Sequence, residues 1–290
     1  MSRSFSPKIS GFKRVVGSFT KLAQAYGRRP DRRTVAVELS RHSGAGNWKE
    51  GMETKHQNRF LTAEWKGLVM LNYAVDASLL KRFVPTGTEL DSFDGSSYVS
   101  LVGFEFNRSR IFGFPVPFHQ TFEEVNLRFY VRRSSKRGVV FIREFVPRYA
   151  VAAIARLAFN ENYSCVPMSH LIVHSAEGVE KAEYIWGSGS DRCVMRIETE
   201  GPSFLPVDGS MGQFITEHYW GYAAQPRDRC LEYEVQHARW RIKCAKRAEF
   251  SGNLAGLYGV EMAQALMRNP DSAFLAEGSP VTVFKGVRIN

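Results

Sequence analysis

The amino-acid sequence predicts an α+β fold that is mainly antiparallel β, with a curled sheet or barrel and a few peripheral helices. Two observations lead to this prediction. From residue 59 onward, short runs of β-branched and aromatic residues follow one another, which is typical of a sheet-rich domain. Most runs are joined by tight-turn sequences, such as residues 94–97, 134–138 and 187–190, and strands joined in this way are antiparallel.

The same runs define the expected elements in chain order. Strands are expected at residues 62–75, 88–93, 98–107, 124–133, 139–147, 171–175, 181–186, 192–199, 231–241 and 281–289. Helices are expected at 77–83, 150–159, 211–218 and 259–267. Since no internal repeat and no linker interrupts this order, residues 59–290 are interpreted as a single domain whose sheet curls on itself.

The first 58 residues differ from the rest in composition. They hold 12 Lys and Arg against 4 Asp and Glu, whereas residues 59–290 hold 27 against 25, so the basicity belongs to this leader. We expect the leader to be largely disordered, because it has few apolar residues to bury. Apolar residues at three-and-four spacing between 12 and 26 indicate one basic amphipathic helix, which suits a membrane surface or a targeting segment. The alternative is an over-extended start, with the domain beginning at Met52.

Charge and composition argue against several classes of partner and site. The nearly balanced charge of residues 59–290 argues against nucleic acid. No stretch reaches the roughly 18 apolar residues of a membrane span. The most apolar stretch, residues 149–159, is interrupted by Arg156. The four cysteines lack CxxC spacing, so we expect reduced thiols in a cytoplasmic protein without a metal site.

Familiar catalytic motifs are missing from the sequence. It contains no GxSxG elbow, no nucleotide-binding GxxxxGKS or GxxxxGKT loop and no HExxH helix. The GlySerGlySer at 187–190 precedes an expected strand rather than a helix, so we interpret it as a turn and not as a phosphate-binding loop. His170 and His174 are four residues apart, and the intervening LeuIleVal favours a strand, which separates them by about 13 Å and argues against a shared metal ion.

The strand expected at 124–133 carries the most informative polar pattern. Alternation along a strand places Glu124, Asn126 and Arg128 on one face and only apolar residues on the other. The apolar face has to pack on a core. The polar face then either meets solvent or lines the interior of a barrel, where a buried Glu and Arg must pair or bind something. In the second case a cavity is expected between this strand and the one at 231–241.

Several blocks of the sequence resemble one protein family. The blocks are residues 60–73, 89–104, 122–132, 214–219, 234–240 and 279–284. In this order they resemble the YqjF-like family of unknown function, which is assigned to the acetoacetate decarboxylase-like superfamily. The resemblance covers residues 58–290. It implies a curled, largely antiparallel barrel around an internal cavity that is lined by the strand carrying Glu124.

One departure from the superfamily bears on activity. In the decarboxylase, an aromatic-x-Glu strand precedes a helix-turn with GlyArgGlu and then a pair of lysines, one of which forms a Schiff base with the keto acid. Residues 122–124 and 155–157 are similar to the first two elements, but residues 160–165 read AsnGluAsnTyrSerCys, without a lysine. A Schiff base requires an amine. Acetoacetate decarboxylation by this mechanism is therefore not expected.

Two hypotheses of function follow. The first is a protein that binds a small anionic or carbonyl-containing molecule in a barrel cavity, with no cofactor. The ligand-binding residues expected for it are Asn126, Arg128, Arg156 and Tyr163. The second is an enzyme of the lyase or hydrolase type, whose general acid or base is sought among Glu124, Glu217 and His237.

Two of these residues also have a purely structural interpretation of equal weight. Arg156 can be a helix residue that extends to solvent, and His237 can be a strand histidine that bonds to the backbone. The sequence leaves a homo-oligomer open.

Overall fold

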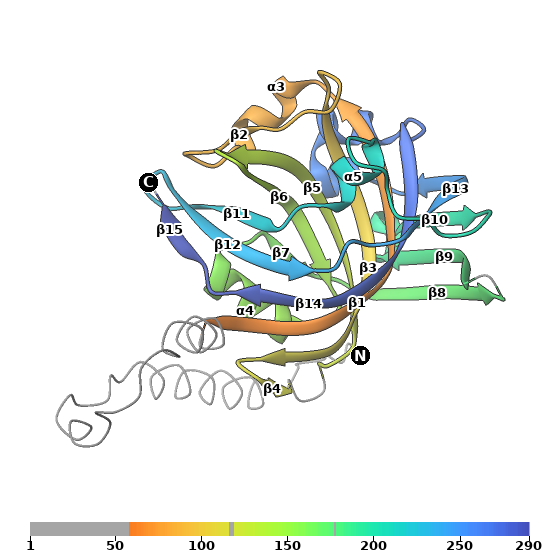
Figure 1. Cartoon of the computed structure of the whole chain (residues 1–290), viewed down its shortest axis with the longest axis horizontal. Helices are drawn as coiled ribbons and strands as arrows, with labels where there is room; N and C mark the ends of the chain where they lie inside the picture. Colours follow the sequence, from red (N-terminus) through yellow and green to blue (C-terminus); the bar gives the residue numbers. More distant parts are fainter. Residues whose placement is uncertain (1–57, 116–118, 177, 290) are drawn as a thin grey trace, which may run out of the picture. The chain divides into compact units, whose positions relative to one another are not determined.

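A computed structural model describes residues 58–115, 119–176 and 178–289 (Figure 1). Its strands are β1 (Arg59–Val75), β2 (Glu89–Leu90), β3 (Ser97–Ile111), β4 (Phe114–Pro115), β5 (Phe122–Arg133), β6 (Lys136–Val146), β7 (Tyr163–Cys165), β8 (Met168–Ser175), β9 (Gly178–Trp186), β10 (Cys193–Thr199), β11 (Trp220–Gln225), β12 (Arg229–His237), β13 (Ile242–Ser251), β14 (Ser272–Phe284) and β15 (Val287–Ile289). The helices are α3 (Ala77–Leu80), α4 (Tyr149–Phe159), α5 (Met211–Thr216), α6 (Ala255–Tyr258) and α7 (Val260–Leu266), with short 3-10 turns η1 (Lys81–Phe83) and η2 (Gly189–Asp191).

The expected leader, including its amphipathic helix and Met52, lies outside the described residues apart from Asn58. Among the helices that the structure describes, none combines the length and the apolar character needed to cross a membrane.

The strands form one sheet that curls on itself. Its order is β15-β12-β11-β6-β5-β3-β1-β14-β13-β10-β9-β8, and β12 pairs with β14 as well, so the pairing returns to its start around an interior. Neighbouring strands are antiparallel except where β6 meets β7 and β11. The contact of β6 with β11 is two residue pairs long, so the sheet is curled without being a regular barrel. The predicted fold class, mainly antiparallel β with few helices, is confirmed.

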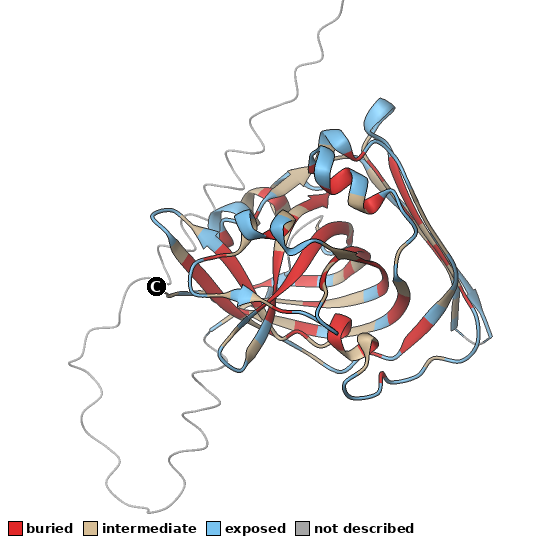
Figure 2. Cartoon of the chain, turned by 90° about the horizontal axis from the view of Figure 1, so that it is seen from above, coloured by how far each residue is buried: buried red, intermediate tan, exposed pale blue. Residues whose placement is uncertain are grey.

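Two hydrophobic cores lie on the two faces of the curled sheet. The outer core is formed by residues of β1, β3, β5 and β6 that pack against β9 and β10 at the far end of the same sheet and against helices α6 and α7, and it contains Tyr184 and Trp186. The inner core faces the interior and contains Phe104, Phe122 and Trp240. In Figure 2 the buried residues follow the strands that surround the interior, while exposed residues gather on loops and outer helix surfaces.

Strand β5 separates these two cores. Its apolar face lies in the outer core, as alternation predicts, with four fully buried side chains: Val125, Leu127, Phe129 and Val131. The polar face therefore points into the curl rather than to solvent. Glu124, Asn126 and Arg128 are only 3%, 2% and 8% exposed.

The last long strand begins earlier than the sequence suggested, at Ser272 instead of residue 281. The prediction was wrong because glycine and proline within β14 interrupt the strand signal. Gly278 has a φ of +88°, and a Cβ atom there would lie 2.0 Å from the carbonyl oxygen of Trp65 on β1. Glycine is required at this close approach of two backbones.

Other elements differ less from the prediction. β4, β7, β11 and β13 were not expected. β13 carries Lys243, Lys246 and Arg247 and so lacks a clean apolar alternation. The strand expected to reach residue 241 ends at His237. The turns at 94–97, 134–138 and 187–190 do connect paired segments. The 3-10 turn η2 begins within the last of them, and β10 follows it.

Candidate functional site

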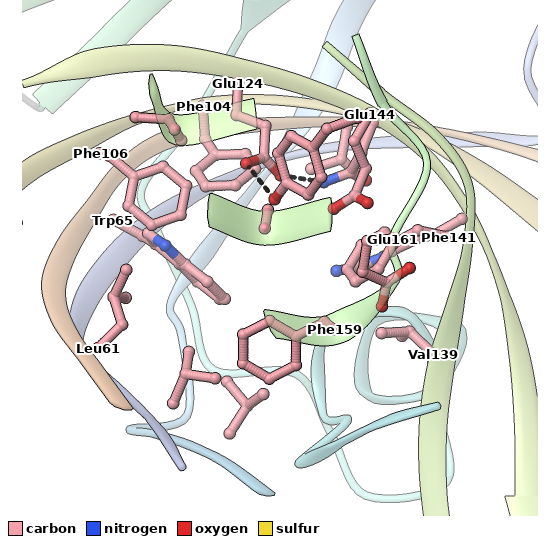
Figure 3. Close-up of a pocket in the computed structure, with 18 of the residues that line it drawn as sticks. Leu61, Trp65, Phe104, Phe106, Glu124, Val139, Phe141, Glu144, Phe159 and Glu161 are labelled. Carbon is pink, nitrogen blue, oxygen red and sulfur yellow. Dashed lines mark hydrogen bonds between the residues drawn. The ribbon is translucent and has the colours of Figure 1, made fainter. Parts of the chain in front are cut away.

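A cavity of about 140 Å³ lies inside the curl (Figure 3). Most of its wall is apolar, and the aromatic side chains that line it include Trp65, Phe104, Phe106, Phe122, Phe141, Phe159 and Trp240. One side is polar instead. Figure 3 shows the carboxyl groups of Glu124, Glu144 and Glu161 gathered there, across the cavity from Leu61 and Trp65. A dry cavity of similar volume is known to hold a benzene-sized molecule.

Neighbouring strands bring the polar residues together. The inward face of β5 supplies Glu124, Asn126 and Arg128. On β6, Glu144 pairs with Asn126 across the sheet. A register shift in β6 after Phe141 reverses its alternation, so that Phe141 and Glu144 both face the cavity although they are three residues apart.

Glu161 reaches the cavity at the end of α4. The helix ends at Phe159, and Asn160, which caps it, adopts a left-handed φ of 60° that Asn tolerates better than most residues. The chain turns there, and the next residue, Glu161, is buried against the cavity. β7 begins two residues later and runs parallel to β6, with Tyr163 paired to Glu144.

Hydrogen bonds hold two of the three carboxyl groups in place. The Tyr163 hydroxyl donates to Oε2 of Glu124 at 2.9 Å, and Nδ2 of Asn126 donates to Oε1 of the same carboxyl group at 3.0 Å. The Tyr233 hydroxyl donates to Oε1 of Glu161 at 2.9 Å. The carboxyl groups are therefore positioned by rigid strand residues rather than by mobile loops.

Burial raises the pKa of all three carboxyl groups. Desolvation raises the pKa of Glu124 to about 7, although its hydrogen bonds from Asn126 and Tyr163 and the charge of Arg128 act in the opposite direction. Desolvation together with the charge of Glu124 raises the pKa of Glu161 to about 8. The pKa of Glu144 lies well above its ordinary value because of desolvation and the two neighbouring carboxylates. Near neutral pH this wall carries both protonated and ionised carboxyl groups.

A cation and a histidine occupy the next part of the polar wall. Nη2 of Arg128 donates to the Ile215 carbonyl oxygen at 3.1 Å, and the guanidinium carbon lies 5.8 Å from the ring centre of Tyr130. His218 packs on the same ring at 4.6 Å. Burial, and then the charge of Arg128, lower the pKa of His218 well below its ordinary value, so its imidazole is neutral.

Several buried polar atoms on this wall lack a hydrogen-bond partner among the described residues. They are Oδ1 of Asn126, Nε of Arg128, Oε2 of Glu144 and both ring nitrogens of His218. An unpaired buried polar group costs roughly 1–3 kcal/mol, so such groups are rare in folded proteins. The wall thus offers unused donors and acceptors to the cavity.

Two of the residues predicted for the site do not reach the cavity. The guanidinium of Arg156 is on the exposed side of α4 and donates through Nε to the Tyr163 carbonyl oxygen at 2.8 Å. Glu217 pairs with Nε of Arg239 at 2.6 Å and, among the described residues, is not part of the cavity wall. Arg156 is not among the residues that line the cavity, because α4 turns Val151, Ile154 and Ala155 inward and the following residue points away.

His237 lines the cavity, but its ring is held by the protein. It stacks on Trp240 with ring centres 4.2 Å apart, and Nδ1 lies 2.8 Å from the Ala238 carbonyl oxygen. Burial lowers its pKa. The contacts of His237 thus match the structural interpretation of this residue, in which a strand histidine bonds to the backbone.

The chemistry of the cavity wall differs from that of a Schiff-base enzyme. None of the described residues that line it is a lysine. Within the described ranges, no group of His, Cys, Asp and Glu is arranged to hold a metal ion. His170 lies on β8, outside the cavity, where Nδ1 is 2.9 Å from Oε1 of Glu123 and Nε2 is 3.4 Å from Oε2 of Glu105.

Sequence reasoning missed Glu144, Glu161, Tyr233 and His218. One signal for Glu144 was available, because it is a charged residue within the apolar run PheIleArgGluPheVal of an expected strand. The signal for Glu161 was its position in the segment where the superfamily has its lysines. Tyr163, which was predicted, comes from the same segment.

The curled antiparallel sheet around a cavity defines this chain as a protein with the acetoacetate decarboxylase-like fold. It is similar to an acetoacetate decarboxylase-like enzyme from Sphingomonas wittichii RW1, with a TM-score of 0.60 and 12% identity over 81% of this chain and 95% of that one. It is also similar to the acetoacetate decarboxylase of Legionella pneumophila, with a TM-score of 0.59 and 13% identity over 89% of this chain and 93% of that one. A third similar structure is the enduracididine biosynthesis enzyme MppR complexed with pyruvate, with a TM-score of 0.58 and 12% identity over 79% of this chain and 90% of that one.

By sequence, the chain belongs to the DUF2071 family of uncharacterised conserved proteins, which it matches over residues 62–280. It is similar to the uncharacterised protein YqjF of Bacillus subtilis (strain 168), with 24% identity over 206 residues that make up 69% of this chain and 82% of YqjF. The predicted resemblance to the YqjF-like family is confirmed. The structural neighbours share the fold, and their low identity carries no activity over to this chain.

Proposed function

We propose that this protein binds a small molecule with an apolar body and a carbonyl or carboxylate group inside the cavity. The observation that carries the proposal is the set of unpaired, buried polar atoms on one wall of an otherwise aromatic cavity. A ligand that bonds to these atoms removes the cost of leaving them unpaired. The aromatic walls supply affinity through burial, and the polar wall supplies orientation.

Arg128 is the group that favours an oxygen-bearing ligand. It is buried, and while Nη2 donates to Ile215, its Nε has no partner among the described residues. A guanidinium presents its donors in a planar fork that matches a carboxylate. On the neighbouring strand β6, the protonated carboxyl group of Glu144 adds a neutral hydrogen-bond donor for a carbonyl oxygen of the ligand. The pyruvate bound by MppR, which has a similar fold, is a ligand of this chemical kind.

Schiff-base decarboxylation is not part of the proposal, because no lysine lines the described cavity wall. We place the protein in the cytoplasm, in keeping with four cysteines that are all free thiols: Cys165, Cys193, Cys230 and Cys244.

The alternative function is an enzyme that uses a carboxyl group of the same cavity as general acid or base. The pKa of Glu124 at about 7 and that of Glu161 at about 8 favour this alternative, because an acid–base group works best when its pKa is near the working pH. His237, the other candidate in the cavity, is occupied by backbone and stacking contacts.

A thermal-shift screen with small carboxylates and carbonyl compounds tests the proposed binding. Wild type is compared with Arg128→Ala and with Arg132→Ala, a matched control on the same strand whose side chain pairs with Glu89 at 2.9 Å outside the cavity. A ligand is expected to raise the melting temperature of wild type and of the control, but not that of Arg128→Ala. The proposal fails if no compound stabilises wild type or if Arg128→Ala responds equally. Turnover that disappears in Glu124→Gln would favour the enzyme alternative.

A further inference from the structure

The hydrogen bonds around Tyr163 indicate where the protons of the carboxyl cluster lie. The Tyr163 hydroxyl interacts with both Glu124 and Glu144. A hydroxyl has a single proton to donate. Because Tyr163 donates that proton to Oε2 of Glu124, Glu124 is the hydrogen-bond acceptor of the pair. The proton of the pair is therefore assigned to Glu144, whose charged form is disfavoured by desolvation and by the charges of Glu161 and Glu124.

The other contacts of Glu124 agree with this assignment. Its second oxygen, Oε1, accepts from Nδ2 of Asn126. Both oxygens of Glu124 are thus acceptors, as in an ionised carboxylate. Oε2 of Glu144, in contrast, has no partner among the described residues and lies at the cavity.

The remaining titratable and charged groups that face the pair support the same proton arrangement. The charge of Arg128 lowers the pKa of Glu124, while the charges of Glu161 and Glu124 raise that of Glu144 further. Two histidines on the wall, His218 and His237, have their pKa lowered by burial, and Glu161 is paired with the Tyr233 hydroxyl. A third histidine, His119, also lines the cavity.

We propose that Glu124 and Glu144, bridged by the hydroxyl of Tyr163, form a proton-transfer pair that enolises a carbonyl compound in the cavity. Glu124 takes a proton from the carbon next to the carbonyl group, and Glu144 gives one to the carbonyl oxygen. The inference rests on the proposed binding of a carbonyl compound. It names the chemistry that the site performs on such a ligand without a Schiff base.

The step balances with the groups that are present. The C–H bond breaks and its electron pair forms the carbon–carbon double bond of the enol, while the carbonyl π electrons bind the proton from Glu144. Glu124 is then protonated and Glu144 is ionised. Tyr163 restores the pair by passing its proton to Glu144 as it accepts the one on Glu124. The sum is a keto-to-enol conversion, and no oxidant or cofactor takes part.

The first arm of the test needs no ligand. The full-length protein is labelled with ¹³C at glutamate carboxyl carbons and titrated by NMR, and the signals are assigned with Glu124→Gln and Glu144→Gln. We expect Glu124 to ionise near pH 7 and Glu144 only at higher pH. A titration in which Glu144 ionises before Glu124 would overturn the proposed pair.

The second arm follows hydrogen exchange in D2O with 2-oxobutanoate and butanone as probes. Loss of the proton signal at the carbon next to the carbonyl group reports enolisation, and thermal shift on the same samples reports binding. General acid–base groups contribute on the order of a hundredfold or more, so Glu124→Gln and Glu144→Gln should each slow exchange by that factor. Tyr163→Phe, which keeps the ring, should slow repeated turnover. The exposed Glu261→Gln is the control and should exchange like wild type.

The outcomes separate the two proposals. Probes that stabilise the protein without exchanging faster than in buffer overturn the proton-transfer pair and leave the binding function intact. Probes that neither bind nor exchange overturn both. If a Gln variant does not fold, as judged by circular dichroism, Tyr163→Phe decides, because exchange at the wild-type rate in that variant contradicts the bridge.

Discussion

Replacing Glu161 by Gln should change how the stability of the protein depends on pH. Glu161 is 8% exposed, and desolvation together with the charge of Glu124 raises its pKa from 4.5 to about 8. A carboxyl group whose pKa is raised by folding binds its proton more tightly in the folded state. Its stabilising effect is complete below pH 4.5 and is lost as the pH rises toward 8.

The size of the effect follows from the pKa difference. At ~1.4 kcal/mol for each pH unit, the interval from 4.5 to about 8 corresponds to a loss on the order of 5 kcal/mol. Gln cannot ionise but keeps an oxygen for the Tyr233 hydroxyl, so the variant should escape this loss. Since a domain has only about 5–15 kcal/mol of stability, the difference is large enough to measure.

Urea unfolding followed by tryptophan fluorescence at several pH values between 5 and 8.5 measures this difference. The free energy of unfolding of wild type should fall more steeply than that of Glu161→Gln, by roughly 1.4 kcal/mol for each pH unit where Glu161 alone titrates. The exposed Glu261→Gln should follow wild type. Parallel curves for wild type and Glu161→Gln would show that folding does not raise this pKa.

Three further predictions concern other parts of the chain. Contact with Glu123 raises the pKa of His170, so the stabilisation by this contact should be present below pH 6.5 and disappear as the pH rises through the raised pKa. The melting-temperature difference between wild type and His170→Gln should therefore shrink as the pH rises. A difference that stays constant with pH would contradict this prediction. A chain that starts at Met52 should melt within a few degrees of the full chain, and a larger drop would show that the leader packs on the domain. Treatment with acetoacetate and borohydride should leave no covalent adduct on the protein that mass spectrometry can detect. A reduced adduct on Lys66, Lys243 or Lys246 would contradict the exclusion of Schiff-base chemistry.

The inward position of Glu124, Asn126 and Arg128 follows from sequence alone once the apolar face of β5 is assigned to a core. A regular strand sends every second side chain to one face, so burial of one face determines the other. The fold class was predictable for a related reason, since tight turns between apolar runs leave antiparallel pairing as the local solution.

The rest of the site depends on irregular backbone that alternation does not reveal. A register shift in β6 turns Glu144 inward, and a left-handed residue after α4 places Glu161. The position of Arg156 outside the cavity wall has a different cause. Arg156 belongs to a regular helix, but which face of that helix meets the cavity is decided by packing against distant strands.

Alternate residues of strand β5 have different positions: the outward side chains build the outer core, and the inward side chains line the cavity. Replacing an outward side chain such as Leu127 by Ala opens a void in the outer core and costs about 2–5 kcal/mol, much of the stability of a domain. Replacing an inward side chain such as Arg128 leaves the outer core untouched. Substitutions at every second position of β5 therefore reshape the cavity wall, while the residues that build the outer core stay unchanged.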